Sequence, residues 1–400
     1  MMKKPTLLEL CKTVLYIGFI GYGGPAILAQ MKKTLVHDRE WISEKEFMEA
    51  LSLAQILPGA TGVSVLGYVG YRLYKFWGGI LLPLFFVLPA TMAILILSWA
   101  YFTYGNLSVI QPFFIGLGAL VVALLVNATL KLGQSVFKTF DWQEVKGLAI
   151  ALATFTGAFF VHINIIWLIL CAGLAGIVFF FFAPVSEGKM SKPEASKIMQ
   201  ADHPTLKLRA LDFLPVLLVA ALEISILFIP EVNRVFLTFI NIGFLAFGGG
   251  FTSIPIIQHQ IVDNLHWLNI RQFMDGIALG QVTPGPVFIT ATFIGYKVFG
   301  IKGALAATLG VFTPSITLMI ALSGLHAKVK KLKLVQAVVK GLLSGFIGLL
   351  VSVTLQFALK SLLSWQAWMI FIASLIIVLY FKKDILWAIL GTMLFSVVCI

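Results

Sequence analysis

The chain has 400 residues, of which 60% are hydrophobic and 12% charged, and its formal net charge is +12. A soluble protein of this length cannot bury so much apolar surface, so a soluble globular fold is excluded. Apolar runs of about twenty residues, the length of a membrane-crossing helix, recur along the chain, and they lack the strict alternation of a membrane β-barrel. The sequence therefore predicts an all-α polytopic membrane protein.

The basic residues lie in short segments between the apolar runs, which is typical of topology signals and argues against a nucleic-acid interface. The three cysteines, Cys11, Cys171 and Cys399, are far apart and suggest neither a disulfide framework nor a metal site. We expect no metal and no cofactor. The N-terminus lacks the pattern of a cleavable signal, so the first helix is expected to direct its own insertion.

The predicted helices fall into three parts of the chain. The N-terminal part, 1–183, has apolar runs at residues 7–30, 50–72, 78–103, 109–132, 146–162 and 164–183. The middle part, 184–230, has a polar linker followed by one helix near 211–229. The C-terminal part, 231–400, has runs at 232–257, 276–297, 300–325, 334–357, 362–381 and 384–400. We expect thirteen crossings, with eleven or twelve as alternatives.

One module occurs twice, with an offset of 225 or 226 residues. Gln55, Pro58 and Gly59 recur as Gln281, Pro284 and Gly285. The other matched landmarks are the glycines at 23–24 and 248–250, Tyr71 with Tyr296, and Arg72 with Lys297. Because six helices return the chain to its starting side and the unpaired helix crosses once more, the second copy is expected to be inverted. The positions of most basic residues place the N-terminus in the cytoplasm.

The paired Pro-Gly elements interrupt apolar runs, where proline removes a backbone donor and glycine loosens the helix. We expect both segments to be broken and to approach one another near the bilayer midplane. A single element of this kind would be read as a kinked packing helix. A pair at equivalent positions in two inverted halves indicates a transporter's binding site.

Several further residues are candidates for substrate or proton binding. The glycines at 23–24 and 248–250 either allow close helix packing or expose N–H groups to an anion. Arg72 and Lys297 serve either as interface anchors or as attractors of an anion. Acids buried at membrane depth are usually functional, so Glu49, its equivalent Asp275, and Glu223 in the unpaired helix are candidate proton carriers.

No nucleotide-binding motif and no catalytic constellation is present in the sequence, so we expect a secondary transporter and not an enzyme. The residues proposed to bind the substrate come from the helix breaks, the glycine elements and the paired cations. It comprises Gly23, Gly24, Gln55, Pro58, Gly59, Thr61, Arg72, Gly248, Gly249, Gly250, Gln281, Pro284, Gly285, Pro286 and Lys297.

These landmarks, above all Phe-Gly-Gly-Gly at 247–250, Gln-Val-Thr-Pro-Gly-Pro at 281–286 and Gly295-Tyr296, resemble the hallmarks of the chromate ion transporter (CHR) superfamily in its long, two-domain form. The first copy departs from the pattern with Ala60 in place of proline. The resemblance implies export of chromate across the bacterial plasma membrane, driven by the proton motive force and conferring chromate resistance, with sulfate as a related dianion.

A tetrahedral dianion needs several hydrogen-bond donors and some positive potential, which helix N-termini after the Pro-Gly pairs and the two glutamines could supply. Other hypotheses remain open: sulfate, another small anion or an organic acid as cargo, a lipid-modifying membrane enzyme, or a channel. A homodimer is also left open.

Overall fold

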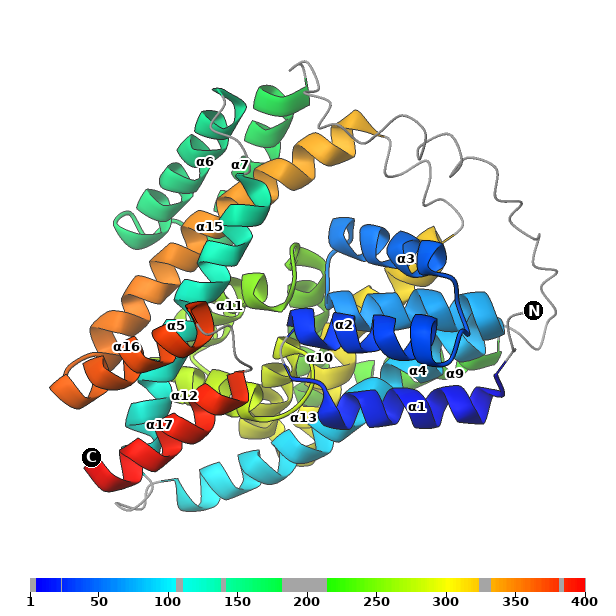
Figure 1. Cartoon of the computed structure of the whole chain (residues 1–400), viewed down its shortest axis with the longest axis horizontal. Coiled ribbons are helices and arrows are strands. Elements are labelled where there is room, and N and C mark those ends of the chain that lie inside the picture. Colours follow the sequence, from blue (N-terminus) through cyan, green and yellow to red (C-terminus); the bar gives the residue numbers. More distant parts are fainter. Residues whose placement is uncertain are drawn as a thin grey trace.

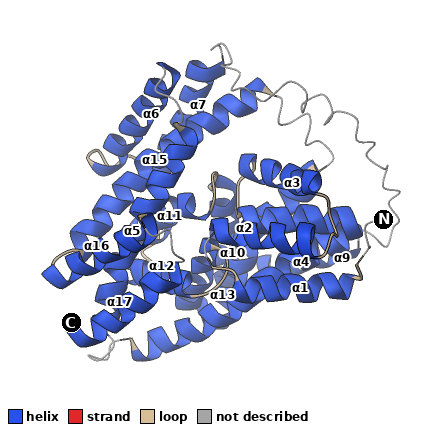
Figure 2. Ribbon diagram, viewed as in Figure 1, coloured by secondary structure: helices blue, strands red, loops and turns tan. Residues whose placement is uncertain are grey.

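The computed structural model describes residues 5–22, 24–105, 111–137, 142–181, 214–323, 332–380 and 385–399, and every regular element within them is a helix (Figure 2). The first copy contains α1 (Leu7–Ile20), α2 (Gly24–Lys32), η1 (Lys33–Asp38), α3 (Glu44–Ile56), α4 (Thr61–Tyr104), α5 (Gln111–Val136), α6 (Trp142–Phe159), α7 (Ile165–Gly176) and η2 (Ile177–Phe181). The unpaired helix is α9 (Leu214–Leu227). The second copy contains α10 (Pro230–Leu245), η5 (Gly250–Thr252), α11 (Ser253–Gln258), η6 (His259–Asn264), α12 (Ile270–Val282), η7 (Val287–Ile289), α13 (Thr290–Leu322), α15 (Lys333–Ser361), α16 (Trp365–Leu379) and α17 (Ile385–Cys399).

Four segments are long and apolar enough to cross a membrane, which confirms the polytopic helical class. They are Thr61–Tyr104, Gln111–Val136, Val287–Leu322 and Lys333–Ser361. Shorter apolar helices accompany them in both copies and between the copies. The copies even share a local irregularity, because the π-helices η1 and η6 begin at equivalent positions, Lys33 and His259.

Helices α4 and α13 each consist of two antiparallel arms. The backbone leaves helical geometry at Tyr74 and Lys75 in α4, and at Phe299 and Gly300 in α13. Across the turn in α4 the backbones of Gly70 and Gly78 touch so closely that a side chain on either would clash. We call residues 61–73 and 290–298 the first arms, and 76–104 and 301–322 the second arms.

Helix α3 and the first arm of α4 form a helical hairpin. The Tyr68 hydroxyl donates to the Glu49 carboxylate over 3.3 Å, and Arg72 donates to Glu46 over 3.2 Å, so the two helices run antiparallel. Each proline-glycine pair forms the tip of such a hairpin, because α12 and the first arm of α13 pair in the same way, with Gly276 against Phe293. The predicted breaks in the apolar runs at 50–72 and 276–297 are confirmed.

The first apolar run of each copy also folds back. Helix α1 ends at Ile20 and α2 begins at Gly24. The Tyr74 hydroxyl donates to the Pro5 carbonyl, so the start of α1 lies at the base of the first hairpin. Lys32 bonds Glu44 and so holds the far end of α2 at the same base. The expected single helix at 7–30 is therefore wrong.

The second copy repeats this fold-back, with the Arg234 guanidinium of α10 lying 5.9 Å from the Trp267 ring at the base of the second hairpin. The expected helix at 232–257 is thus also divided, with Ala246, Phe247, Gly248 and Gly249 between its parts. Thirteen continuous crossings were therefore wrong. A hydropathy pattern cannot separate one crossing helix from two short apolar arms that meet at a tip, because both have the same length and composition.

The elements form two lobes (Figure 1). One lobe contains the hairpin of the first copy and the second arms of both copies, and α11 and α12 of the second copy lie between this lobe and the other. The other contains α5, α6, α7, α15, α16 and α17. In this second lobe the copies exchange helices: α15 packs against α6 and α7 of the first copy, while α5 packs against α16 and α17 of the second. The two sequence repeats are therefore interlocked in space.

Helix α9 contacts α10 and α4 along one side only, and its other side chains, such as Leu217 and Leu218, are exposed. The unpaired helix thus lies at the edge of the molecule, as expected from its lack of an equivalent.

Candidate functional site

The tips of the two copies are joined by a reciprocal pair of backbone hydrogen bonds. The N–H of Gly59 donates to the carbonyl of Ala246 over 2.7 Å, and the N–H of Gly285 donates to the carbonyl of Gly21 over 2.8 Å. Gly59 is equivalent to Gly285, and Gly21 to Ala246. A contact in which each copy offers the same two positions to the other is the signature of a twofold relation.

Only glycine suits the two tips. Gly59 and Gly285 have φ angles of 109° and 120°, which L-residues rarely adopt. A Cβ atom on Gly59 would collide with the Ser315 hydroxyl, and one on Gly285 would lie 2.7 Å from the Cβ of Ala90. The backbones of the tips therefore contact the second arms of the opposite copy.

Ser315 and Ala90 occupy equivalent positions in the two copies. The difference between them explains why residue 60 is alanine where the second copy has Pro286. The N–H of Ala60 donates to the Ser315 hydroxyl over 2.8 Å in a buried environment. The equivalent Pro286 has no N–H, so the alanine opposite it leaves no donor unpaired. Neither copy therefore leaves a buried backbone N–H without a partner at this position: the first pairs the N–H of Ala60 with Ser315, and the second has Pro286, which lacks an N–H, opposite Ala90.

The glycine segment at 246–250 links the two Pro-Gly tips. Ala246 accepts from Gly59 of the first tip, while Gly250 packs against Val287 just after the second tip. Gly248 and Gly249 have φ angles of 88° and 111°, and a Cβ on Gly249 would meet nothing within 4 Å. The tips therefore approach one another through this segment. The counterpart Gly23 lies outside the described residues.

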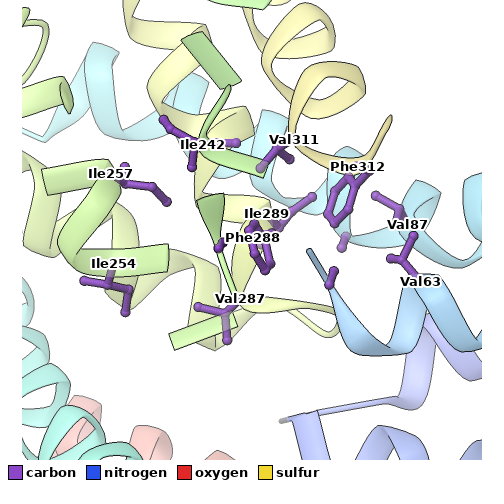
Figure 3. Close-up of a cluster of buried hydrophobic side chains, with 14 of the residues drawn as sticks. Val63, Val87, Ile242, Ile254, Ile257, Val287, Phe288, Ile289, Val311 and Phe312 are labelled. Atoms are coloured by element: carbon purple, nitrogen blue, oxygen red, sulfur yellow. The ribbon is translucent and has the colours of Figure 1, made fainter. Parts of the chain in front are cut away.

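Apolar side chains from both copies pack around the tips (Figure 3). Val63 and Val87 of the first copy lie near Phe312 of the second, and Phe288 and Ile289 follow the second tip. Polar backbone groups in such surroundings are strongly stabilised when they find partners and costly when they do not. The tips are consequently held among close-packed apolar side chains.

Helices begin at the tips as well as end there. Gly24 starts α2 and Thr61 starts α4, and the short helix η7 leads into α13 at Thr290. The first N–H groups of a helix have no partner within it and carry a partial positive charge. This arrangement concentrates hydrogen-bond donors where the predicted substrate-binding residues gather.

The two glutamines next to the tips differ in environment. Gln281 is 7% exposed, and its Nε2 atom has no hydrogen-bond partner within the described part of the chain. Gln55, at the equivalent place in α3, is exposed. A buried carboxamide donor without a partner beside the second tip is suited to an acceptor-rich ligand.

The structure does not bring Arg72 and Lys297 to the tips. Arg72 pairs with Glu46 at the base of the first hairpin, and the Lys297 ammonium lies 5.1 Å from the Phe102 ring, near the end of the second. At the same base, the Lys32 ammonium bonded to Glu44 holds the pKa of that carboxyl below its usual range. The cations thus lie one hairpin length from the breaks.

Each candidate proton carrier accepts a hydrogen bond from a hydroxyl. The donor to Glu49 is Tyr68 of its own hairpin. Tyr101 of α4 donates to Asp275 over 2.7 Å, and Thr313, beside Pro314, donates to Glu223 over 2.7 Å. Asp275 and Glu223 are therefore tied to the second arms.

The sequence alone did not predict a role at the site for Tyr101, Thr313 or Ser315. Ser315 could have been found by asking what faces the N–H of Ala60 where the other copy has proline. Thr313 lies in the repeated landmark Thr313-Pro314, the equivalent of Leu88-Pro89, but no pattern marks Tyr101.

These features define a multi-pass helical membrane protein in which two interlocked repeats bring broken helices together at one internal site. The chain belongs to the Chromate transporter family, whose sequence model matches residues 8–177 and 233–397.

Named relatives cover most of the chain. It is 30% identical over 383 residues to the chromate transport protein of Cupriavidus metallidurans, covering 94% of this chain and 89% of that protein. It is 31% identical over 360 residues to the chromate transport protein of Pseudomonas aeruginosa, covering 88% and 80% respectively. An uncharacterized transporter of Methanocaldococcus jannaschii, MJ0718, is 32% identical over 390 residues, covering 96% and 92%. No solved structure matches the chain.

Proposed function

We propose that this protein is a secondary transporter that exports chromate across the bacterial plasma membrane, coupled to the proton motive force and conferring chromate resistance. The single observation that carries the proposal is the reciprocal bonding of Gly59 to Ala246 and of Gly285 to Gly21, which gathers four helix breaks at one place. Paired helix breaks in a repeated membrane protein are the usual place for a transported ion. Chromate is proposed as the cargo because relatives of this chain are named for chromate transport.

The chemistry of the tips suits an oxyanion. Chromate presents four oxygens and two negative charges, and the tips offer the N-termini of α2, α4 and α13 together with the unpartnered Nε2 of Gln281. These donors supply positive potential without a fixed cation, so the anion can leave again after binding. Arg72 and Lys297 are better placed to attract an anion at a distance than to bind it.

Sulfate is the second candidate, because it has the same shape and charge as chromate and backbone donors do not distinguish the two ions. Competition between them for uptake into vesicles would measure the preference directly.

The same proposal includes an inverted arrangement of the copies. Because α1 with α2, and α3 with the first arm of α4, fold back, they do not cross the membrane. The crossing elements of the first copy are then α5, α6, α7 and the second arm of α4, and an even number of crossings returns the chain to its starting side. Helix α9 then crosses once, so the second copy starts from the other side. The hairpins of the two copies would enter from opposite faces and meet at their tips, with the N-terminus in the cytoplasm.

Proton coupling is assigned to Asp275, Glu49 and Glu223, the acids that accept hydroxyl hydrogen bonds. A carboxylate held by one donor at membrane depth can exchange a proton when the conformation changes.

The experiment is chromate uptake into everted membrane vesicles, with and without an uncoupler. Uptake that collapses with the uncoupler supports proton-coupled export. Uptake that ignores the pH gradient would identify a channel, and the absence of chromate uptake alongside sulfate uptake would replace the cargo.

A further inference from the structure

The two copies pack differently between the lobes. Helix α12 of the second copy packs along α5, where a Cβ on Gly118 would lie 3.7 Å from Met274, and α11 contacts α15. The equivalent helix α3 lacks a comparable contact with α15 within the described residues. As a result Met48 is 45% exposed whereas its equivalent Met274 is 3% exposed.

This difference extends along one helical face. Positions 48, 52 and 55 of α3 are three or four residues apart and therefore line the same side. Their equivalents in α12, at 274, 278 and 281, are all buried. We call residues Met48, Ser52 and Gln55 the α3 face, and residues Met274, Ala278 and Gln281 the α12 face.

The partners of the two faces are also equivalent. Helices α5 and α15 end at Val136 and Ser361, which are 225 residues apart. In that register they share Gln111 with Gln336, Gly116 with Gly341, Leu124 with Leu349, Leu125 with Leu350, Val126 with Val351, Thr129 with Thr354 and Leu130 with Leu355. Helix α15 is therefore the equivalent of α5, with Leu343 at the position where Gly118 faces Met274.

The composition of the α3 face favours water over lipid. Gln55 is exposed on this face whereas its equivalent Gln281 is buried, and exposed Lys45 lies one turn before Met48. Lipid-facing surfaces of membrane helices exclude such groups because their desolvation is costly. The face leads directly to the tip at Pro58 and Gly59.

We infer that this structure is one end state of an alternating-access cycle, in which the α3 face lines the aqueous route to the hairpin tips. In the opposite state the α3 face packs on α15 as the α12 face now packs on α5, and the α12 face becomes the lining of the second route. Repeats of this kind exchange conformations by the rocking of one bundle against the other. The role of this cycle in transport rests on the proposed function, whereas the exchange between the two conformations does not depend on the cargo.

Cysteine accessibility tests the first half of the inference. Met48→Cys and Met274→Cys are compared in the full chain after Cys11, Cys171 and Cys399 are changed to serine, using a water-soluble maleimide on the reconstituted protein. If the opposite state is populated at about 1–10%, Cys at 274 should react roughly 10–100-fold more slowly than Cys at 48. Ser52→Cys against Ala278→Cys repeats the comparison one turn further along.

Cross-linking tests the second half. The pair Gly118→Cys with Met274→Cys should be joined by a short bifunctional thiol reagent in the present state, and the pair Met48→Cys with Leu343→Cys in the opposite state. The 48–343 link should expose the α12 face, so that Ala278→Cys in that linked chain reacts at the rate Ser52→Cys shows in the unlinked one. Each link should also stop transport, and reductive cleavage of the reagent should restore it.

Three results would overturn the inference: equal reactivity at 48 and 274, reaction at 48 only with lipid-soluble maleimides, or failure of the 48–343 link in a protein that forms the 118–274 link. None of these three results depends on a measurement of chromate transport. A protein that switches accessibility but carries no chromate would refute the proposed cargo and leave the inference standing.

Discussion

The hydroxyl of Tyr101 donates to the carboxylate of Asp275 over 2.7 Å, and this bond joins the far end of α4 in the first copy to the hairpin of the second. The equivalent acid Glu49 takes its bond from Tyr68 within its own hairpin. Phe293 is the equivalent of Tyr68 in the second copy and has no hydroxyl to donate to Asp275. The centroid of its ring lies 5.2 Å from that of the Tyr101 ring. The two equivalent acids are thus held differently, one within a hairpin and one between the copies.

This difference predicts unequal roles in coupling. Asp275→Asn should preserve chromate binding but flatten the pH dependence of uptake, because the amide cannot exchange a proton. Tyr101→Phe should shift the pH profile without flattening it, since the acid remains but loses its donor. Chromate uptake measured across a pH series in vesicles checks both.

Glu49→Gln and Tyr68→Phe are the matched controls in the first copy. A parental pH profile in all four variants would remove both acids from the coupling mechanism and leave Glu223, held by Thr313, as the remaining acid to substitute.

Alanine at either tip glycine should destabilise the protein severely. Gly59→Ala and Gly285→Ala each force an unfavourable φ angle, at about 1–3 kcal/mol, and insert a methyl group into a packed contact, at about another 1–3 kcal/mol. Thermal unfolding in detergent should show a lowered midpoint, with uptake lost. Gly133→Ala, a helical site with nothing within 4 Å, should leave both unchanged, and tip variants that match it would contradict the packing of the tips.

Ser315→Ala should destabilise the protein by about 1–3 kcal/mol, because it leaves the buried N–H of Ala60 without a partner. Ala60→Pro removes that donor, and its φ of −79° is compatible with proline. The double variant reproduces the Pro286 and Ala90 pair of the other copy, so it should recover most of the lost stability. Additive losses in a double-mutant cycle would show that the hydrogen bond contributes nothing.

Glutamate at the two tip glutamines should have unequal effects. Gln281→Glu replaces a buried donor with an acceptor that repels a dianion, so chromate uptake should fall at least tenfold at neutral pH. Gln55→Glu places the same change at an exposed position and should reduce uptake less. Initial rates at several chromate concentrations check this, and equal losses in both variants would argue against the burial of Gln281 as the cause.

Neutralising the paired cations should have modest effects. Arg72→Gln breaks a partly exposed ion pair with Glu46, worth up to about 1 kcal/mol of stability, and Lys297→Gln removes a cation beside an aromatic ring. Both lie away from the tips, where screening weakens attraction for an anion. Uptake within a few fold of the parent is expected, whereas abolished uptake with intact protein would place these cations in the transport step.

The sequence by itself determined that this is a polytopic helical membrane protein with two copies of one module, because hydropathy and internal repetition are properties of the chain alone. It also located the breaks, since proline and glycine disrupt a helix wherever it lies. The pairs Gln55 with Gln281 and Glu49 with Asp275 followed from the same repeat.

Only the tertiary structure decided what the breaks do. Whether Pro58 and Gly59 bend a crossing helix or form the tip of a hairpin depends on contacts such as Arg72 with Glu46, which hydropathy does not encode. The bonds from Gly59 to Ala246 and from Ala60 to Ser315 join residues far apart in the chain, and their energies arise only when the copies interlock. The unequal burial of Met48 and Met274 is also decided by the fold, because two equivalent methionines differ only in what packs against them.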